Sequence, residues 1–144
     1  MKIIIGSDHR GYTLKKLIKQ NFKEKEIELL DAGTDNGNDN VDYPIFTKRV
    51  CEAVLSGEAD RGILICGSGI GVSIAANRFP KIYAALCWTP EIARLAREHD
   101  LANVLALAAD FTSPEDALKI AESWLKAEFL GGKYQRRLEM LEIS

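Results

Sequence analysis

The sequence lacks a long hydrophobic run and a strong excess of charge of either sign. Its 144 residues carry a formal net charge of −2, which gives no reason to expect nucleic acid or an anionic membrane as a partner. No apolar run is long enough to cross a bilayer, and the apolar run in the opening MKIIIGSDH is too short for a signal peptide. We therefore expect a cytoplasmic protein that does not span a membrane.

Cysteine and histidine are both scarce. The three cysteines, Cys51, Cys66 and Cys87, form an odd set without paired spacing, which favours reduced thiols in a cytosol over disulfides. Cys51 and Cys87 are predicted to be small core residues, because free cysteine is often buried. The two histidines, His9 and His99, lie far apart without metal-ligand spacing, so we predict that the chain binds no metal.

The chain contains an alternation of short apolar segments and amphipathic segments. Apolar residues make up 47% and charged residues 28%, which is ordinary for a single globular domain. The predicted strands are KIIIGS at 2–7, IELLDAG at 27–33, RGILIC at 61–66, IYAALCW at 82–88 and NVLALAA at 103–109. Five such strands separated by helices predict an α/β fold, a five-stranded parallel sheet in a doubly wound three-layer sandwich.

Helices are predicted between these strands and after the last one. Thr89 and Ser113 have the residue type and position of N-caps. The lysines of the first helix, opposite its apolar face, are expected to be solvated. The predicted helices cover 12–25, a segment from Tyr43 through Val54, 72–79, 90–100, Ser113 to about Leu130, and about 133–143.

The stretch LICGSGIGVS, residues 64–73, ends an apolar strand in Cys66 and then places three glycines at alternate positions: Gly67, Gly69 and Gly71. Glycine weakens a regular element, so three within five residues indicate a backbone that closely approaches something. Ligands of parallel sheets bind beyond the carboxyl ends of the strands, where this loop lies. Backbone N–H groups entering a helix bind phosphate, carboxylate or an oxyanion. The alternative is a tight turn that binds no ligand.

The glycine loop matches neither of two common nucleotide motifs. A dinucleotide fingerprint would need glycine where Val72 stands and an acidic residue about 20 residues on, where the next strand ends in CWTP. No Gly-Lys-Ser/Thr sequence follows, which excludes a P-loop.

Cys66 is a candidate base or nucleophile, because a thiol beside a helix N-terminus has its thiolate form favoured. The alternative is an inert core cysteine. Asp8 and His9 follow the first strand and are expected at the same edge of the sheet. His99 continues an apolar helical stripe, which is typical of a core histidine or of one favoured by the helix dipole.

Six segments, in order over the whole chain, are SDHRGYTLK, DYP, GILICGSGIGVSIAANR, ARLAREHD, NVLAL and GGKYQRR. Together they resemble ribose-5-phosphate isomerase of type B, a family that includes galactose-6-phosphate isomerase subunits. The resemblance implies one isomerase domain over 1–144 with a Rossmann-like sheet. It also implies a homodimer, in some members paired into a tetramer, and cofactor-free and metal-free aldose–ketose isomerisation of a sugar phosphate.

By position, the resemblance makes Cys66 the base that moves a proton through an enediolate, with Ser68 and the glycine loop holding the negative charge. Members with a glutamate base carry it where Val72 stands, so this sequence follows the cysteine version. The same resemblance has His99 and Asp8 open the sugar ring. Substrate binding is implied for Asp8, His9, Tyr43, Gly67, Ser68, Gly69, Ile70, Gly71, Asp100 and a phosphate clamp of Lys133 and Arg137.

Three positions differ from the family pattern. Asp100 stands in place of the usual Asn, Asp110 in place of a basic residue, and Lys133 in place of Arg. The ammonium of Lys133 is a point charge, whereas the guanidinium of arginine can form two parallel hydrogen bonds with phosphate. We expect these changes to alter phosphate affinity or sugar preference. The open alternatives are an isomerase of allose or galactose 6-phosphate, and a module that binds a phosphosugar or nucleotide without turnover.

The predicted topology separates two of the site residues. His99 ends the helix that leads into the fifth strand, so it lies near the amino ends of the strands, whereas Cys66 lies at a carboxyl end. We therefore predict a two-fold dimer in which Cys66 of one chain and His99 of the other share an active site.

Overall fold

The computed structural model describes residues 1–142, which form five strands and six helices. The strands are β1 (Lys2–Ser7), β2 (Glu28–Gly33), β3 (Arg61–Cys66), β4 (Ala84–Leu86) and β5 (Val104–Ala108). The helices are α1 (Tyr12–Glu24), α2 (Tyr43–Ser56), α3 (Ile70–Ala76), α4 (Pro90–Asp100), α5 (Pro114–Lys126) and α6 (Lys133–Leu141).

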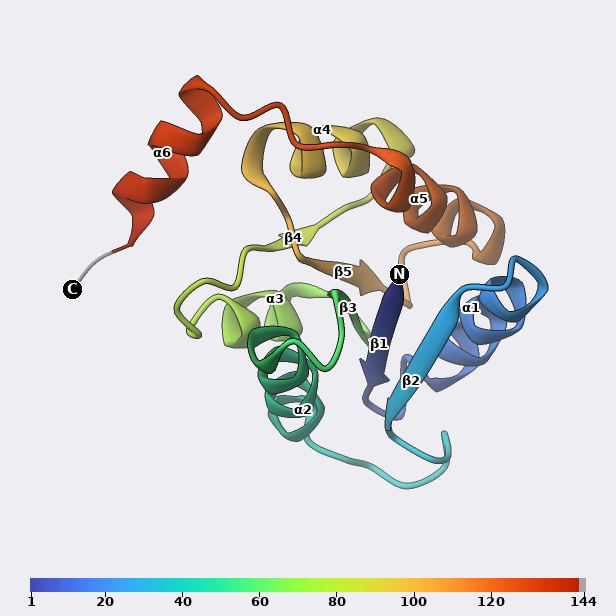
Figure 1. The fold of residues 1–144 in the computed structure, drawn as a ribbon. Coiled ribbons are helices and arrows are strands. Elements are labelled where there is room, and N and C mark those ends of the chain that lie inside the picture. The colour runs from blue at the N-terminus through green and yellow to red at the C-terminus, as the bar shows by residue number, and fades with distance from the viewer. Residues whose placement is uncertain (143–144) are drawn as a thin grey trace.

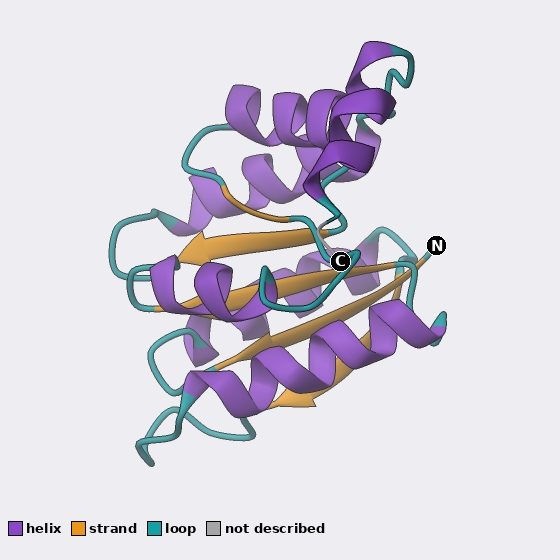
Figure 2. Cartoon of the chain, turned by 90° about the vertical axis from the view of Figure 1, so that its left-hand side faces the viewer, coloured by secondary structure: helices purple, strands orange, loops and turns teal. Residues whose placement is uncertain are grey.

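The strands form one parallel sheet in the order β2-β1-β3-β5-β4, which confirms the predicted doubly wound α/β fold. Helices α1, α4 and α5 cover one face, and α2 and α3 cover the other (Figure 1). Figure 2 shows the sheet between these two helical layers. The carboxyl ends of the parallel strands therefore meet at one edge of the sheet, where the loops that follow them come together.

Successive side chains of each strand point to opposite faces of the sheet, so apolar residues along a strand are buried by helices on both faces. In β1, Ile3 and Ile5 pack with α1, α4 and α5, whereas Ile4 packs with α2 and α3. All three side chains are buried. Strands buried on both faces read as continuous apolar runs, which is the pattern of KIIIGS and RGILIC.

Two elements, β4 and α5, are shorter than predicted, and long-range contacts lie at their boundaries. Strand β4 has three residues, because the side chain of Asn103 accepts a hydrogen bond from Tyr83 N–H at 2.8 Å. Asn77 in turn makes two hydrogen bonds with the backbone of Ala84. Helix α5 ends at Lys126 and not near Leu130, whose N–H donates to Glu98 O at 3.0 Å, at the end of α4.

The other predicted helix boundaries lie closer to those of the structure. The α3 helix begins at Ile70 and ends at Ala76, two residues earlier than expected at its start and three at its end. Thr89 and Ser113 accept hydrogen bonds from Ile92 N–H and Asp116 N–H, which confirms both N-caps. Helix α6 ends at Leu141, and position 143 of its predicted range lies outside the described residues.

Lys15 of α1 contradicts the prediction that the lysines of this helix are solvated. Its side chain is 1% exposed, and Nζ lies 2.6 Å from Asp31 Oδ1 and 2.6 Å from Thr34 O. Lys16, Lys23 and Lys25 are exposed, as predicted. The buried ammonium joins α1 to the edge strand β2 through this ion pair. The helical pattern of the sequence alone does not reveal that contact.

None of the helices in residues 1–142 has the length and apolar character needed to cross a membrane.

Candidate active site

A pocket of about 340 Å³ opens at the carboxyl ends of β1, β3 and β5. This volume falls within the range of about 300–1,000 Å³ that is usual for small-molecule sites. The lining residues are Asp8, Arg10, Tyr43, Cys66, Gly67, Ser68, Gly71, Asp110 and Phe111. The structure therefore brings together six of the predicted site residues at this edge: Asp8, Tyr43, Cys66, Gly67, Ser68 and Gly71.

Cys66 is the last residue of β3 and lines the pocket, although only 5% of it is exposed. Hydrogen bonds from Ala109 N–H to Cys66 O and from Asp110 N–H to Gly67 O, both 2.9 Å, tie its loop to the end of β5. Cys51 and Cys87 are fully within the core, as predicted. Burial is the main reason that the pKa of both thiols is raised to about 12.

The glycines of the loop after β3 are needed for close packing. Gly69 has φ of 73°, and a Cβ there would lie 2.5 Å from Leu86 Cδ1. A Cβ on Gly71 would lie 2.7 Å from Cζ of Tyr43, the first residue of α2. The loop backbone thus fits against its neighbours, and Ser68 Oγ accepts a hydrogen bond from Ile70 N–H within it at 3.2 Å.

The turn after β1 holds Asp8 in place. Asp8 is 7% exposed, and its Oδ1 accepts hydrogen bonds from the N–H groups of Arg10 and Gly11 at 3.0 and 3.1 Å. Aspartate is favoured in such turns because its carboxylate takes up the backbone donors that follow it. His9 does not line the pocket, and its Nδ1 accepts a hydrogen bond from Val41 N–H at 3.2 Å.

Arg10 and Asp110 form an ion pair at this edge of the sheet through Arg10 Nη2 and Asp110 Oδ2. The pair lies over Gly67, where a Cβ would meet Asp110 Oδ2 at 2.7 Å and Arg10 Nε at 2.8 Å. The sequence interpretation overlooked Arg10. Its place directly after Asp8 and His9, at the end of a buried strand, was the available signal.

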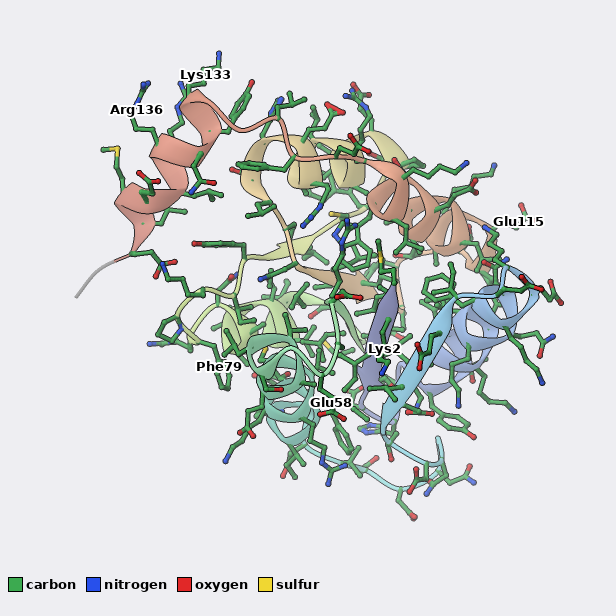
Figure 3. The ribbon with its side chains drawn as sticks, in the orientation of Figure 1. Lys2, Glu58, Phe79, Glu115, Lys133 and Arg136 are labelled. Carbon is green, nitrogen blue, oxygen red and sulfur yellow. The ribbon has the colours of Figure 1, made fainter. Side chains whose placement is uncertain are left out.

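Four of the remaining predicted site residues lie at α4 and α6, away from the pocket. His99, near the end of α4, stacks on Tyr134 of α6 with ring centroids 4.3 Å apart. Lys133 Nζ and Arg137 Cζ lie 5.3 and 5.7 Å from the centre of the same ring. Figure 3 shows Lys133 at the outer end of α6. Asp100 is exposed at the end of α4, and none of these residues lines the pocket.

Gly69 and Ile70 also lie outside the set that lines the pocket, and Ile70 is 55% exposed at the start of α3. Residues 1–142 contain no group of three or more His, Cys, Asp or Glu side chains placed to hold a metal ion.

The sequence and fold of the chain are similar to those of known proteins. The family model described as Ribose/Galactose Isomerase matches residues 3–141. The chain belongs to this family. It is 43% identical over 140 residues to ribose-5-phosphate isomerase B of Escherichia coli, covering 97% of this chain and 93% of that protein. It is 44% identical over 140 residues to the probable ribose-5-phosphate isomerase B of Mycoplasma genitalium, covering 96% and 92% of the two chains.

Solved structures of this isomerase family share the fold. Ribose-5-phosphate isomerase B of Clostridium thermocellum has a TM-score of 0.97 at 50% identity, covering 99% of this chain and 95% of that one. The Mycoplasma genitalium enzyme with bound ribulose-5-phosphate has a TM-score of 0.93 at 43% identity, covering 97% and 93%. The predicted resemblance to the type B isomerases is therefore confirmed over nearly the whole length of the chain.

Proposed function

We propose that this member of the ribose/galactose isomerase family is an aldose–ketose isomerase that interconverts ribose 5-phosphate and ribulose 5-phosphate. The observation that carries the proposal is the pocket that joins the Cys66 thiol, the Asp8 carboxylate and the glycine loop at one edge of the sheet. The relatives named ribose-5-phosphate isomerase B, and the one solved with ribulose-5-phosphate, support this choice of substrate.

Cys66 is the base in the proposed mechanism. Its thiolate removes the proton from C2 of the open-chain aldose, and the C–H electron pair forms the carbon–carbon double bond of an enediolate. As that double bond forms, the electrons of the C1 carbonyl move onto the C1 oxygen. The thiol then returns its proton to C1, and the hydroxyl proton on the C2 oxygen moves to the C1 oxygen, so that C2 becomes the ketone and C1 a hydroxymethyl group. Proton transfer by a positioned side chain typically contributes about 10²–10⁴ in rate.

The glycine loop and Ser68 stabilise the enediolate. The negative charge that develops on the sugar oxygens needs hydrogen-bond donors already in place, and the backbone N–H groups of the loop and the Ser68 hydroxyl are such donors beside Cys66. Losing one donor of this kind typically costs about 10²–10³ in rate. The close packing of Gly69 and Gly71 favours a preorganised loop, because little rearrangement is left for the reaction step.

Each active site in this proposal is shared by two chains of a homodimer, which in turn could pair into a tetramer. His99, with Lys133 and Arg137, belongs to the group at α4 and α6, and a two-fold partner would bring that group to the pocket. His99 and Asp8 would then open the ring, and Lys133 and Arg137 would hold the phosphate.

Exposed apolar side chains support the homodimer. They include Ile70 (55% exposed), Ile74 (58%), Trp88 (65%), Phe111 (82%) and Met140 (75%). Ile70 and Ile74 lie on α3, Phe111 lines the pocket, and Met140 lies on α6, which projects from the rest of the chain (Figure 1). Large exposed apolar side chains near a site are typical of a protein–protein interface.

All three cysteines are free, which supports a reducing, cytoplasmic location.

A coupled assay that follows formation of ribulose 5-phosphate from ribose 5-phosphate tests the proposal directly. We expect turnover with ribose 5-phosphate, and comparison with allose 6-phosphate and galactose 6-phosphate gives the preferred sugar. Binding of ribose 5-phosphate without any product, with all three sugars inert, would overturn the isomerase proposal in favour of a binding module.

A further inference from the structure

The pocket is poor in positive charge for a site that receives a phosphorylated sugar. Its charged lining residues are two carboxylates, Asp8 and Asp110, and one cation, Arg10. A phosphate monoester carries close to two negative charges at neutral pH. Within the described part of this chain, Arg10 is therefore the one pocket residue that can offset the charge of such a substrate.

The two carboxylates are in different situations. Asp8 Oδ1 already accepts two backbone N–H groups of its own turn. Asp110 instead accepts from Arg10 Nη2, and its Oδ2 lies close to where a Cβ of Gly67 would be. Asp110 therefore orients the guanidinium over Gly67, and the absence of a side chain on Gly67 leaves room for it.

The guanidinium keeps donors available for a ligand. It has five N–H donors in a planar fork, and Nη2 is its one atom that makes a side-chain hydrogen bond within residues 1–142. The Arg10 side chain is 58% exposed and lines the pocket, so a ligand can reach it there. Arginine forks pair with phosphate through two parallel hydrogen bonds.

We propose that Arg10 binds the phosphate group of the substrate, and that Asp110 is a positioning residue that holds the Arg10 guanidinium over Gly67. This assignment rests on the proposed isomerase function. Cys66 lines the same pocket and directly precedes Gly67, so the reacting carbons lie beside Cys66 while the phosphate lies farther out, at Arg10.

The first test is Arg10→Ala, with Lys126→Ala as the matched control. Lys126 is 74% exposed and paired with Glu122 on α5, so the control also removes a surface cation from an ion pair. Losing a charged hydrogen bond should raise the KM for ribose 5-phosphate about 10- to 100-fold in Arg10→Ala. The value of kcat should change little, because the phosphate contact is the same in ground and transition states. Arg10→Lys should recover part of the loss.

A charge exchange tests the role of Asp110. Arg10→Asp alone should lose binding more severely than Arg10→Ala, since it adds a third carboxylate to the pocket. In the double variant Arg10→Asp, Asp110→Arg, the guanidinium approaches Gly67 from the other side, and the KM should return to within about tenfold of wild type. Failure of the exchange to improve on Arg10→Asp, in a variant whose melting temperature matches wild type, would overturn the positioning role.

Titration calorimetry with inorganic phosphate separates this proposal from the isomerase proposal, because it needs no turnover. We expect the affinity for phosphate to fall at least about tenfold in Arg10→Ala and to stay unchanged in Lys126→Ala. Unchanged phosphate affinity and KM in a folded, active Arg10→Ala would overturn the assignment and leave the isomerase intact. An inactive wild-type protein that still binds phosphate through Arg10 would overturn the isomerase alone.

Discussion

His99 and Tyr134 stack face to face, with their ring centroids 4.3 Å apart and their planes inclined by 7°. Such contact between aromatic rings is worth about 0.5–1.5 kcal/mol beyond the area it buries. The stack joins the end of α4 to α6 and keeps the imidazole with Lys133 and Arg137. The stack thus holds His99 with the residues of α6, and not in the pocket that Cys66 of the same chain lines.

Subunit exchange tests whether two chains share each active site. Cys66→Ala and His99→Ala should each be inactive alone, since each removes one residue from every site. A mixed dimer has one site with both defects and one with neither, so an equal mixture should recover about a quarter of wild-type activity under random pairing. Background activity in a sample proven by mass spectrometry to contain mixed dimers would show that His99 serves its own chain.

Alkylation should single out Cys66. Cys66→Ala is expected to abolish isomerisation while leaving the unfolding transition and substrate binding nearly unchanged. Iodoacetamide should inactivate the wild type, and ribose 5-phosphate should protect it. Cys51→Ala and Cys87→Ala serve as controls, because burial raises the pKa of both thiols to about 12 and keeps them protonated at neutral pH. Normal turnover by Cys66→Ala would disprove the proposed base.

Removal of the cations on α6 should weaken substrate binding. Lys133→Ala or Arg137→Ala should each cost about 1.5–3 kcal/mol of binding free energy, as expected for a hydrogen bond to a charged group. The loss should appear in KM more than in kcat. Arg136→Ala is the control on the same helix, because that position is not part of the predicted clamp. Equal KM values for all three variants and wild type would place the phosphate elsewhere.

The ion pair between buried Lys15 and the partly exposed Asp31 should contribute more to the stability of the β2 edge than the pair of Lys19 with the same carboxylate. Lys15→Met should cost about 1.5–3 kcal/mol of unfolding free energy, because it removes the charged hydrogen bonds from the buried ammonium to Asp31 and to Thr34 O, while Asp31 keeps its solvent contact and its pairing with Lys19. Lys19→Met is the matched control. Lys19 Nζ lies 2.7 Å from Asp31 Oδ2 but its side chain is 39% exposed, so its loss should cost about 1 kcal/mol or less. Denaturant titration of both variants measures the difference.

The same pair should make the free energy of unfolding depend on pH in the acidic range. Burial alone would raise the pKa of Asp31, but hydrogen bonds from Lys15, Lys19 and Gly33 N–H outweigh it and lower the pKa below 3.8. The stabilisation by ionised Asp31 is therefore full above the unfolded pKa and is lost as pH falls through the lower folded value. The stability difference between wild type and Asp31→Asn should shrink below about pH 3.8. A difference that is constant from pH 6 to pH 2 would contradict this assignment.

The order of strands and helices could be predicted from the sequence because periodicity directly reflects which faces are buried. The boundaries that failed depend on partners distant in sequence. Asn103 accepts from Tyr83 N–H just before β4, Asn77 bonds the backbone of Ala84 at the first residue of β4, and Glu98 O accepts from Leu130 N–H beyond α5. The prediction that Lys15 is solvated was wrong for the same reason, because the amphipathic pattern of α1 does not show that a carboxylate of β2 lies beside the helix.

The candidate site was predictable where it follows strand ends. Cys66 and Asp8 come directly from β3 and β1, and parallel strands bring such positions together. Arg10 was overlooked because its place directly after Asp8 and His9 was its only signal, and a lone arginine in a turn has no spacing that distinguishes it from a solvated one. The role proposed for Arg10 depends on Asp110, 100 positions later in the chain, which only the folded sheet places beside it.

The hydrogen bond from Val41 N–H to His9 Nδ1 determines the tautomer of that imidazole. A neutral ring that accepts through Nδ1 carries its proton on Nε2, so His9 offers a donor, and no acceptor, to anything that approaches that nitrogen. Hydroxyl and phosphate oxygens can accept from such a ring, whereas an ammonium group in their place finds no lone pair on Nε2. A single backbone amide thus gives His9 a chemical preference among ligands.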